Sequence, residues 1–173
     1  MKNILIIRSA DIKTMNKLIE YIKVNNKNDN NVYCLIQKSS IIDFKKKYPH
    51  INYIEKEDGF FNYKDFKKNI QLISNLNSIY FDEVYIPSST VDFPNFQETF
   101  MIASKLNTNK NILFNCYGDV NEQKLDFYYS YFNKHFSNIL YFLKVLVAFL
   151  GIALIYLTMH FCYFIKGKGN FKN

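Results

Sequence analysis

A long uninterrupted apolar run near the carboxyl end constrains this chain more than any other feature. The run VLVAFLGIALIYLTMHFCYFI occupies positions 145–165 and contains no Asp, Glu, Lys or Arg, with His160 as its one imidazole. Twenty-one helical residues extend about 31 Å, which matches a hydrocarbon core of about 30 Å. The alternative is a buried core helix, but a domain of this size has little use for a helix that is apolar all round. The run therefore predicts a transmembrane helix.

The segments on either side of this run fit a membrane helix. An aromatic-rich juxtamembrane segment, 119–144, precedes it and a basic tail, 166–173, follows it. Aromatic residues are enriched at membrane–water interfaces. Positions 121–173 carry six lysines against two acidic residues, which fits a membrane surface. We expect the lipid bilayer as a partner and no nucleic acid, because no nucleic-acid-binding module is recognisable in the sequence.

Two observations bear on topology and they disagree. Two lysines, Lys134 and Lys144, precede the run and three follow it, which by charge alone places the tail inside. The opening MKNILIIRSAD, in contrast, has an apolar run too short for a signal peptide, which favours a cytoplasmic N-terminal domain. We predict a single-pass protein of the cell membrane with its N-terminal domain in the cytoplasm. A monotopic or re-entrant helix is the alternative that satisfies both observations.

Residues 1–118 alternate short β-rich runs with segments of helical periodicity. The predicted strands are NILIIR (3–8), NVYCLIQ (31–37), INYIE (51–55), DEVYIP (82–87) and NILFNC (111–116). Strands that alternate with helices predict a mostly parallel sheet with right-handed crossovers and helices on both faces. The predicted fold class is α/β: a single Rossmann-like domain, 1–118, with a five-stranded mostly parallel sheet, followed by a C-terminal transmembrane helix.

Apolar spacing and capping signals place the helices. Apolar side chains recur at helical spacing over 12–22, 66–76 and 96–106, and a short helix over 40–48 is expected to end before Pro49. Three pairs have the spacing of a capping box: Ser40 with Asp43, Asn62 with Asp65, and Asn95 with Glu98.

The residues that follow the strands are the candidate site. Ligands of open parallel sheets bind beyond the carboxyl ends of the strands. The hydroxyl-rich, mixed-charge side chains at these positions suit a sugar or a phosphate. The predicted ligand-binding residues are Arg8, Ser9, Ser88, Ser89, Thr90 and Asn115, and the predicted general base is Asp11.

Arg8 and Asp11 each have a structural alternative. Arg8, the only arginine in the chain, has a planar guanidinium suited to an anionic group, and a carboxylate such as Asp11 suits a general base. Alternatively, Asp11 caps the helix that begins at Ile12 while Arg8 pairs with a neighbouring carboxylate. The stretch PSST, 87–90, is equally well explained as a polar turn.

Sequence motifs for cofactors and metals are missing. RSADIKT, after the first strand, contains no glycine, so the G-x-G-x-x-G dinucleotide signature is absent, and KGKG at 166–169 lacks P-loop spacing. The three histidines stand alone, and the three cysteines are far apart. We therefore expect no cofactor, no metal and no disulfide.

The order of segments resembles the N-terminal half of the GT-B glycosyltransferases of family 9, the lipopolysaccharide heptosyltransferase type. The resemblance covers roughly residues 3–118. It is carried by ILIIRSAD, KKYPHINYIE, YFDEVYIP and IASKLNTNKNILFN, which are similar to that family's first strand and loop, its third strand, its Y-D-x-V-I strand and its fifth strand. The resemblance implies an acceptor-binding domain in which Asp11 is the base. The predicted transmembrane helix stands where that family has its donor-binding half.

The resemblance thus implies a membrane-anchored glycosyltransferase-like protein, incomplete as an enzyme on its own. Its role would be that of an acceptor-side or accessory subunit in cell-envelope polysaccharide or glycolipid synthesis. The implied partners are a separate donor-binding glycosyltransferase subunit and a lipid-linked or glycan acceptor. The alternatives are a non-enzymatic membrane-tethered α/β scaffold or interaction protein, and a free-standing small transferase with a different donor site.

Overall fold

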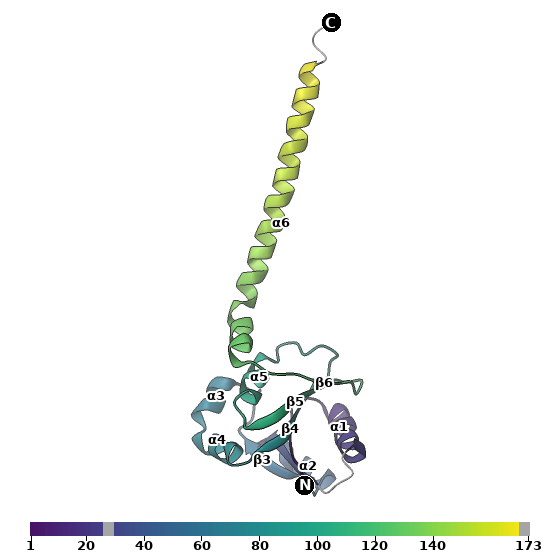
Figure 1. The fold of residues 1–173 in the computed structure, drawn as a ribbon, viewed down its shortest axis with the longest axis vertical. Coiled ribbons are helices and arrows are strands. Elements are labelled where there is room, and N and C mark those ends of the chain that lie inside the picture. The colour runs from purple at the N-terminus through teal and green to yellow at the C-terminus, as the bar shows by residue number, and fades with distance from the viewer. Residues whose placement is uncertain (26–29, 170–173) are drawn as a thin grey trace. The chain divides into compact units, whose positions relative to one another are not determined.

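A computed structural model describes residues 1–25 and 30–169 (Figure 1). The chain divides into two compact units, Met1–Lys134 and His135–Asn173. The strands are β1 Asn3–Ile7, β2 Asn31–Gln37, β3 Asn52–Lys56, β4 Phe81–Pro87, β5 Thr108–Phe114 and β6 Val120–Glu122. The helices are α1 Ile12–Asn25, the short 3-10 helix η1 Lys38–Ser40, α2 Ile41–Lys47, α3 Tyr63–Lys68, α4 Ile70–Asn77, α5 Gln97–Ala103 and α6 Phe127–Gly169.

The first unit is an α/β domain built on a mixed sheet of six strands. The strand order is β3-β2-β1-β4-β5-β6, in which β1 to β5 are parallel. Strand β6 pairs with β5 in the antiparallel direction, with Phe114 opposite Val120. The order of β1 to β5 is that of doubly wound sheets, in which the chain starts in the middle and builds outward in both directions.

The predicted five-stranded sheet is wrong by one strand. Residues Val120–Glu122, which lie in the predicted juxtamembrane segment, form the sixth strand. The chain reverses directly after β5 through Gly118, whose φ of +97° suits a residue without a side chain. So tight a reversal leaves no room for a crossover helix and returns the chain antiparallel to β5. Strand β6 has only three residues, all exposed, so the sequence shows no alternating apolar pattern that would predict it.

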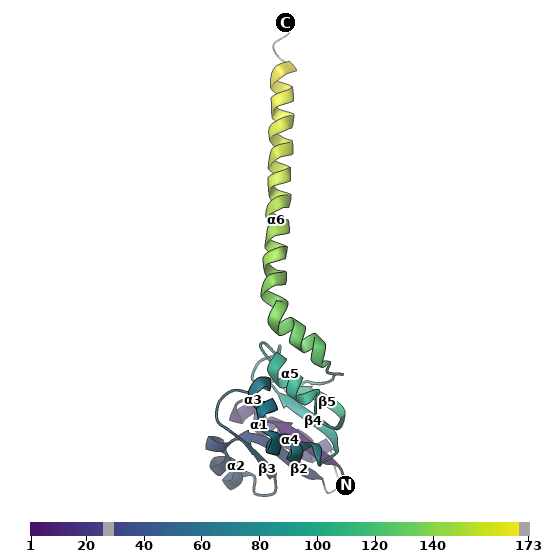
Figure 2. The ribbon, with the colours of Figure 1, turned by 90° about the vertical axis from the view of Figure 1, so that its left-hand side faces the viewer.

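Side-chain alternation along the strands builds a core on each face of the sheet. On β1, Ile4 and Ile6 point to the face covered by α1 and α2, whereas Leu5 and Ile7 point to the face covered by α3, α4 and α5. All four are fully buried. Figure 2 views the sheet from the α3 and α4 side. The near-continuous apolar sequence of β1 reflects this burial on both faces.

The helix predicted over 66–76 is two helices. The chain breaks at Asn69, whose side chain accepts a hydrogen bond from the backbone N–H of Leu72 at 3.0 Å and so caps α4. The break turns Ile70 out of the apolar stripe, and its side chain is 79% exposed. Of the three predicted caps, only Asn62 caps a helix with its side chain, by accepting from the N–H groups of Lys64 and Asp65. Ser40 makes no capping bond, and Phe96 rather than Asn95 precedes α5.

Helix α6 contains a segment that is long and apolar enough to cross a membrane. This segment is Tyr141–Cys162, 22 residues with a mean hydropathy of 2.3, and it is the one candidate span among the described residues. It begins four residues before the predicted start at 145. The helix continues without a break through the predicted end at 165 and into the predicted basic tail, as far as Gly169. The side chains beyond Cys162, and residues 170–173 of that tail, lie outside the described part of the structure.

Candidate functional site

The loops after β1 and β4 meet where the strand order reverses. Ser9 Oγ donates to the backbone oxygen of Pro87 at 2.6 Å, and the backbone N–H of Asp11 donates to Ser89 Oγ at 2.8 Å. The carboxyl ends of β1 and β4 are neighbours in the sheet. The structure therefore brings together the residues that the sequence placed after these two strands.

Asp11 is a helix cap. Its Oδ1 accepts a hydrogen bond from the backbone N–H of Thr14 at 2.8 Å. That bond is the main reason why the pKa of Asp11 lies below its usual value, and the Ser89 hydroxyl lowers it further. The carboxylate is therefore ionised at neutral pH but a weak proton acceptor.

The other polar residues after β4 bond mainly to one another. Ser88 is 1% exposed, and its Oγ lies 2.9 Å from Thr90 Oγ1 and accepts from the Thr90 N–H at 3.1 Å. Thr90 Oγ1 also donates to the backbone oxygen of Asp92 at 2.6 Å. This is the polar turn that the sequence offered as the alternative for 87–90.

Asn115 organises the turn after β5. Its Oδ1 accepts from the N–H groups of Tyr117, Gly118 and Asp119 at 2.9–3.1 Å. Its Nδ2 donates to Asp119 Oδ2 at 2.8 Å. The side chain is 6% exposed, so its hydrogen-bonding capacity is used inside the fold.

Arg8 is held by an amide and a ring. Its Nη1 donates to Gln37 Oε1 at 2.8 Å, and the guanidinium carbon lies 4.9 Å from the centre of the Phe44 ring. Its Nε is buried without a hydrogen-bond partner among the described residues. The neighbouring carboxylate that the structural alternative supposed is thus replaced by the amide of Gln37.

A cavity of about 510 Å³ opens beyond the carboxyl ends of β1 to β4, and we call it the edge cavity. Its lining residues are Arg8, Ser9, Ala10, Gln37, Phe60, Phe61, Asn62, Pro94, Asn95, Phe96, Glu98 and Thr99. Of the predicted site residues, Arg8 and Ser9 are in this lining; Asp11, Ser88, Ser89, Thr90 and Asn115 are not. A cavity at this edge of a doubly wound sheet is where such folds hold ligands.

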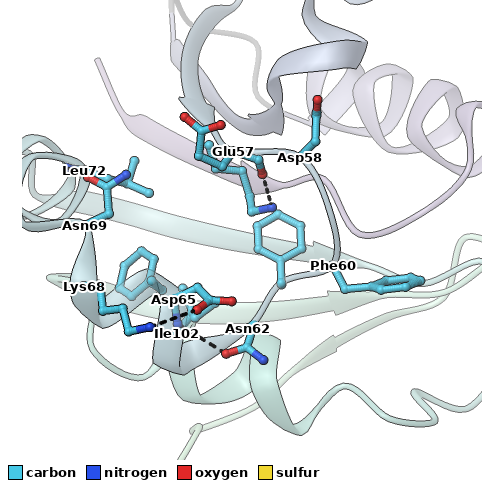
Figure 3. Close-up of a pocket in the computed structure, with 12 residues that line it drawn as sticks. Glu57, Asp58, Phe60, Asn62, Asp65, Lys68, Asn69, Leu72 and Ile102 are labelled. Carbon is cyan, nitrogen blue, oxygen red and sulfur yellow. Dashed lines mark hydrogen bonds and ion pairs between the residues drawn. The ribbon is translucent and has the colours of Figure 1, made fainter.

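A second cavity of about 390 Å³ lies beside the first, against α3, and we call it the α3 cavity (Figure 3). Its lining residues are Lys56, Glu57, Asp58, Phe60, Phe61, Asn62, Asp65, Phe66, Lys68, Asn69, Leu72 and Ile102. Figure 3 shows Glu57 and Asp58 on one side and Asp65 with Lys68 on the opposite side. The two cavities share three residues, Phe60, Phe61 and Asn62.

The loop 57–62 between the cavities is fixed by hydrogen bonds. Lys56 Nζ donates to the backbone oxygens of Glu57 and Gly59 at 2.5 and 2.9 Å and lies over the ring of Phe61. Burial lowers the pKa of Lys56. In the same half of the loop, Asp58 Oδ1 accepts from the N–H of Ser39 at 2.9 Å, and this bond lowers the pKa of Asp58.

Glu98 joins three elements at the wall of the edge cavity. Its Oε2 accepts from the backbone N–H of Tyr63 at 2.8 Å, and its Oε1 pairs with Lys134 Nζ. It therefore ties the starts of α3 and α5 to the first turns of α6, within the unit Met1–Lys134. The sequence marked Glu98 only as a capping residue.

Neither a cluster of metal ligands nor a known relative helps to identify the site. Among residues 1–25 and 30–169, no three His, Cys, Asp or Glu side chains are grouped closely enough to hold a metal ion. Comparisons with protein-family models, curated proteins and solved structures found no match. The site is thus defined by its own chemistry: two cavities lined by phenylalanine rings and planar polar groups.

Proposed function

We propose that this protein is a membrane-anchored sugar-binding subunit of a glycosyl-transfer system in cell-envelope polysaccharide or glycolipid synthesis. Its Rossmann-like domain holds the glycan acceptor in the edge cavity, and a separate donor-binding subunit supplies the activated sugar. The domain is cytoplasmic, and α6 anchors it to the cell membrane. The observation that carries the proposal is the edge cavity at the strand-order reversal.

The lining of the edge cavity supports a sugar ligand. One face of a pyranose is a patch of C–H groups that packs on aromatic rings, which Phe60 and Phe96 supply. Its hydroxyl groups point outward in the ring plane and need planar donors and acceptors. Arg8, Gln37 and Asn62 are such groups.

The environment of Asp11 favours a domain that binds the acceptor over a domain that carries out the reaction. Its carboxylate already caps α1, its pKa lies below the usual value, and it does not line the edge cavity. A base that deprotonates a sugar hydroxyl works best with a pKa raised toward the working pH. We therefore assign catalysis to the partner subunit.

Anchoring has a physical benefit for such a subunit. The Tyr141–Cys162 segment confines the domain to the bilayer surface. A lipid-linked acceptor is confined to the same surface, so tethering raises the effective concentration of the two. This benefit applies only if the acceptor is carried by a lipid.

The test is glycan binding by the full chain purified in detergent. We expect binding on a printed array of neutral glycans, and about a tenfold loss in Arg8→Met, which removes the hydrogen bonds but keeps most of the volume. Gln37→Leu is the second variant, and Lys23→Met, an exposed site on α1, is the control. Stoichiometric binding of a nucleotide sugar to the protein alone in calorimetry contradicts an accessory role. Absence of any glycan binding contradicts the proposal as a whole.

A second candidate is a non-enzymatic membrane-tethered scaffold. It is favoured by the internal hydrogen bonds of Ser9, Asp11, Ser88, Thr90 and Asn115. Because these polar groups at the sheet edge already hydrogen-bond within the fold, fewer of them are left to bind a ligand. A double variant, Arg8→Ala with Asp11→Ala, that folds and leaves the cellular phenotype unchanged supports the scaffold over the sugar-binding subunit.

A further inference from the structure

The two cavities are adjacent parts of one surface. The edge cavity and the α3 cavity lie on either side of loop 57–62 and share Phe60, Phe61 and Asn62 in their linings. Each volume, about 510 and about 390 Å³, falls within the roughly 300–1,000 Å³ of small-molecule sites. A ligand longer than either cavity can therefore occupy both by passing over the loop.

Phe60 stands at the boundary between the cavities as an exposed ring on a fixed loop. Its side chain is 97% exposed, although it lines both cavities. Figure 3 shows the ring apart from the other labelled side chains. The bonds of Lys56 and Asp58 hold the loop backbone in place, so this backbone loses little conformational freedom when a ligand covers the ring. An apolar ring presented in this way is favourable to cover.

Most charged side chains around the two cavities are held by partners within the fold. Lys68 Nζ lies 3.8 Å from Asp65 Oδ1, and Lys56 Nζ is bound to two backbone oxygens. In the edge cavity, Glu98 pairs with Lys134, whereas Arg8 donates to the neutral amide of Gln37 and keeps its positive charge. The α3 cavity has two lysines against three acidic residues.

In the α3 cavity, the charge pattern selects against anionic ligands. A phosphate or nucleotide is held by concentrated positive charge or by several backbone N–H groups. The α3 cavity instead has an excess of one carboxylate, counted over its lining residues. Its rim of carboxylates, amides and an ammonium group matches hydroxyl groups, which both donate and accept.

We propose that the edge cavity and the α3 cavity together bind a neutral oligosaccharide of at least two sugar units, with one ring stacked on Phe60. This inference rests on the proposed function and specifies its ligand. The edge cavity holds the unit contacted by Arg8 and Gln37. The α3 cavity holds the next unit, whose hydroxyl groups bond to Asp65 and Lys68.

The test measures how binding depends on glycan length. The full chain in detergent is applied to an array of neutral linear oligosaccharides of one to six units built from hexoses, deoxyhexoses and N-acetylhexosamines. Fragments of nucleotide sugars and anionic glycans are printed on the same array. We expect apparent affinity to rise about tenfold from one unit to three, because a second unit adds contacts without a second loss of translational freedom.

Two variants separate the parts of the groove. Phe60→Ala is expected to weaken binding of the three-unit glycan about tenfold. The double variant Asp65→Ala with Lys68→Ala is expected to weaken the three-unit glycan to a similar degree and to leave single units unaffected. The matched controls are Tyr80→Ala, an exposed aromatic residue outside both cavities, and Lys64→Ala with Lys67→Ala on the exposed side of the same helix. Circular dichroism confirms that each variant is folded.

The outcomes distinguish this inference from the proposed function. If single units bind but length brings no gain, or if the Asp65 and Lys68 variant binds long glycans normally, the extended groove is wrong and the edge cavity stands alone. A preference for anionic glycans or nucleotide sugars overturns the neutral ligand. If no glycan of any length binds, the proposed function itself fails.

Discussion

The Asp11 carboxylate accepts a hydrogen bond from the backbone N–H of Thr14 at 2.8 Å. The same residue uses its own N–H to bond Ser89 Oγ in the loop after β4. The Asp11 side chain thus caps the N-terminus of α1, and the Asp11 backbone bonds this terminus to the loop after β4. The arrangement gives Asp11 a structural role that involves no reaction at the carboxylate.

Replacing Asp11 tests this structural role. We expect Asp11→Ala to lower the free energy of unfolding by about 1 kcal/mol, because a helix N–H loses its acceptor. Asp11→Asn retains an acceptor oxygen and is expected to be close to the native protein. Thermal unfolding of the full chain in detergent, followed by the near-ultraviolet circular dichroism of its tyrosines, measures both. Lys13→Ala is the control. Equal losses in the Ala and Asn variants would show that charge, not capping, matters.

The lowered pKa of Asp11 predicts a loss of stability in acid. A folded-state pKa below the unfolded value of 3.8 stabilises the fold above that pH and ceases to do so as pH falls through the folded-state pKa. The free energy of unfolding should therefore decline below about pH 4, and less steeply in Asp11→Asn. Urea unfolding at several pH values measures the slope. A slope identical in the native protein and in Asp11→Asn contradicts the assignment. The pKa of Asp58 is lowered too, so Asp58 contributes a pH dependence that remains in Asp11→Asn.

The strands of the core were predictable from the sequence because their burial has a simple pattern. Strands β1, β2 and β4 are apolar runs covered on both faces, and their observed bounds lie within a residue of those expected. Strand β6 was not predictable, since it is short, exposed and held only at the sheet edge. The break at Asn69 was also hidden, because the apolar spacing on either side of it continues as if through one helix.

The site was predictable only where it follows a strand directly. Arg8 and Ser9 line the edge cavity because a residue just past a parallel strand must lie at the sheet edge. Phe60 comes from a loop whose path depends on the bonds of Lys56 and Asp58, which no local pattern encodes. Asn115 has the right position but turns inward, since three backbone N–H groups of its own turn compete for its oxygen.

Gly59 should be sensitive to substitution through its backbone alone. Its φ is +104°, and a Cβ added there meets nothing within 4 Å. We expect Gly59→Ala to lower the free energy of unfolding by about 1–2 kcal/mol, because an L-residue is strained in this conformation. The control is Lys64→Ala, at an exposed position of α3. Thermal unfolding measures the difference. A Gly59→Ala variant as stable as the native protein contradicts the fixed loop.

Asn115 should be important for stability. We expect Asn115→Ala to lower the free energy of unfolding by about 2 kcal/mol, because three N–H groups in a tight turn lose a shared buried acceptor. Asn109→Ala, at an exposed position of β5, is the control and should change little. Chemical unfolding measures both variants. A loss confined to glycan binding, with unchanged stability, would instead return Asn115 to the ligand site.

A charge at the centre of the apolar segment of α6 should prevent membrane insertion. Ile152 lies near the middle of Tyr141–Cys162, and its side chain is 67% exposed. Arginine at a span's centre costs about 2.5–3.5 kcal/mol of insertion free energy, whereas near an end the side chain reaches the interface. We expect Ile152→Arg to reduce the share of the chain that resists alkaline carbonate extraction from membranes, and Tyr141→Arg to have little effect. If both variants remain as resistant as the native protein, the segment does not span a bilayer, and the helix is held at the membrane or within an assembly by other contacts.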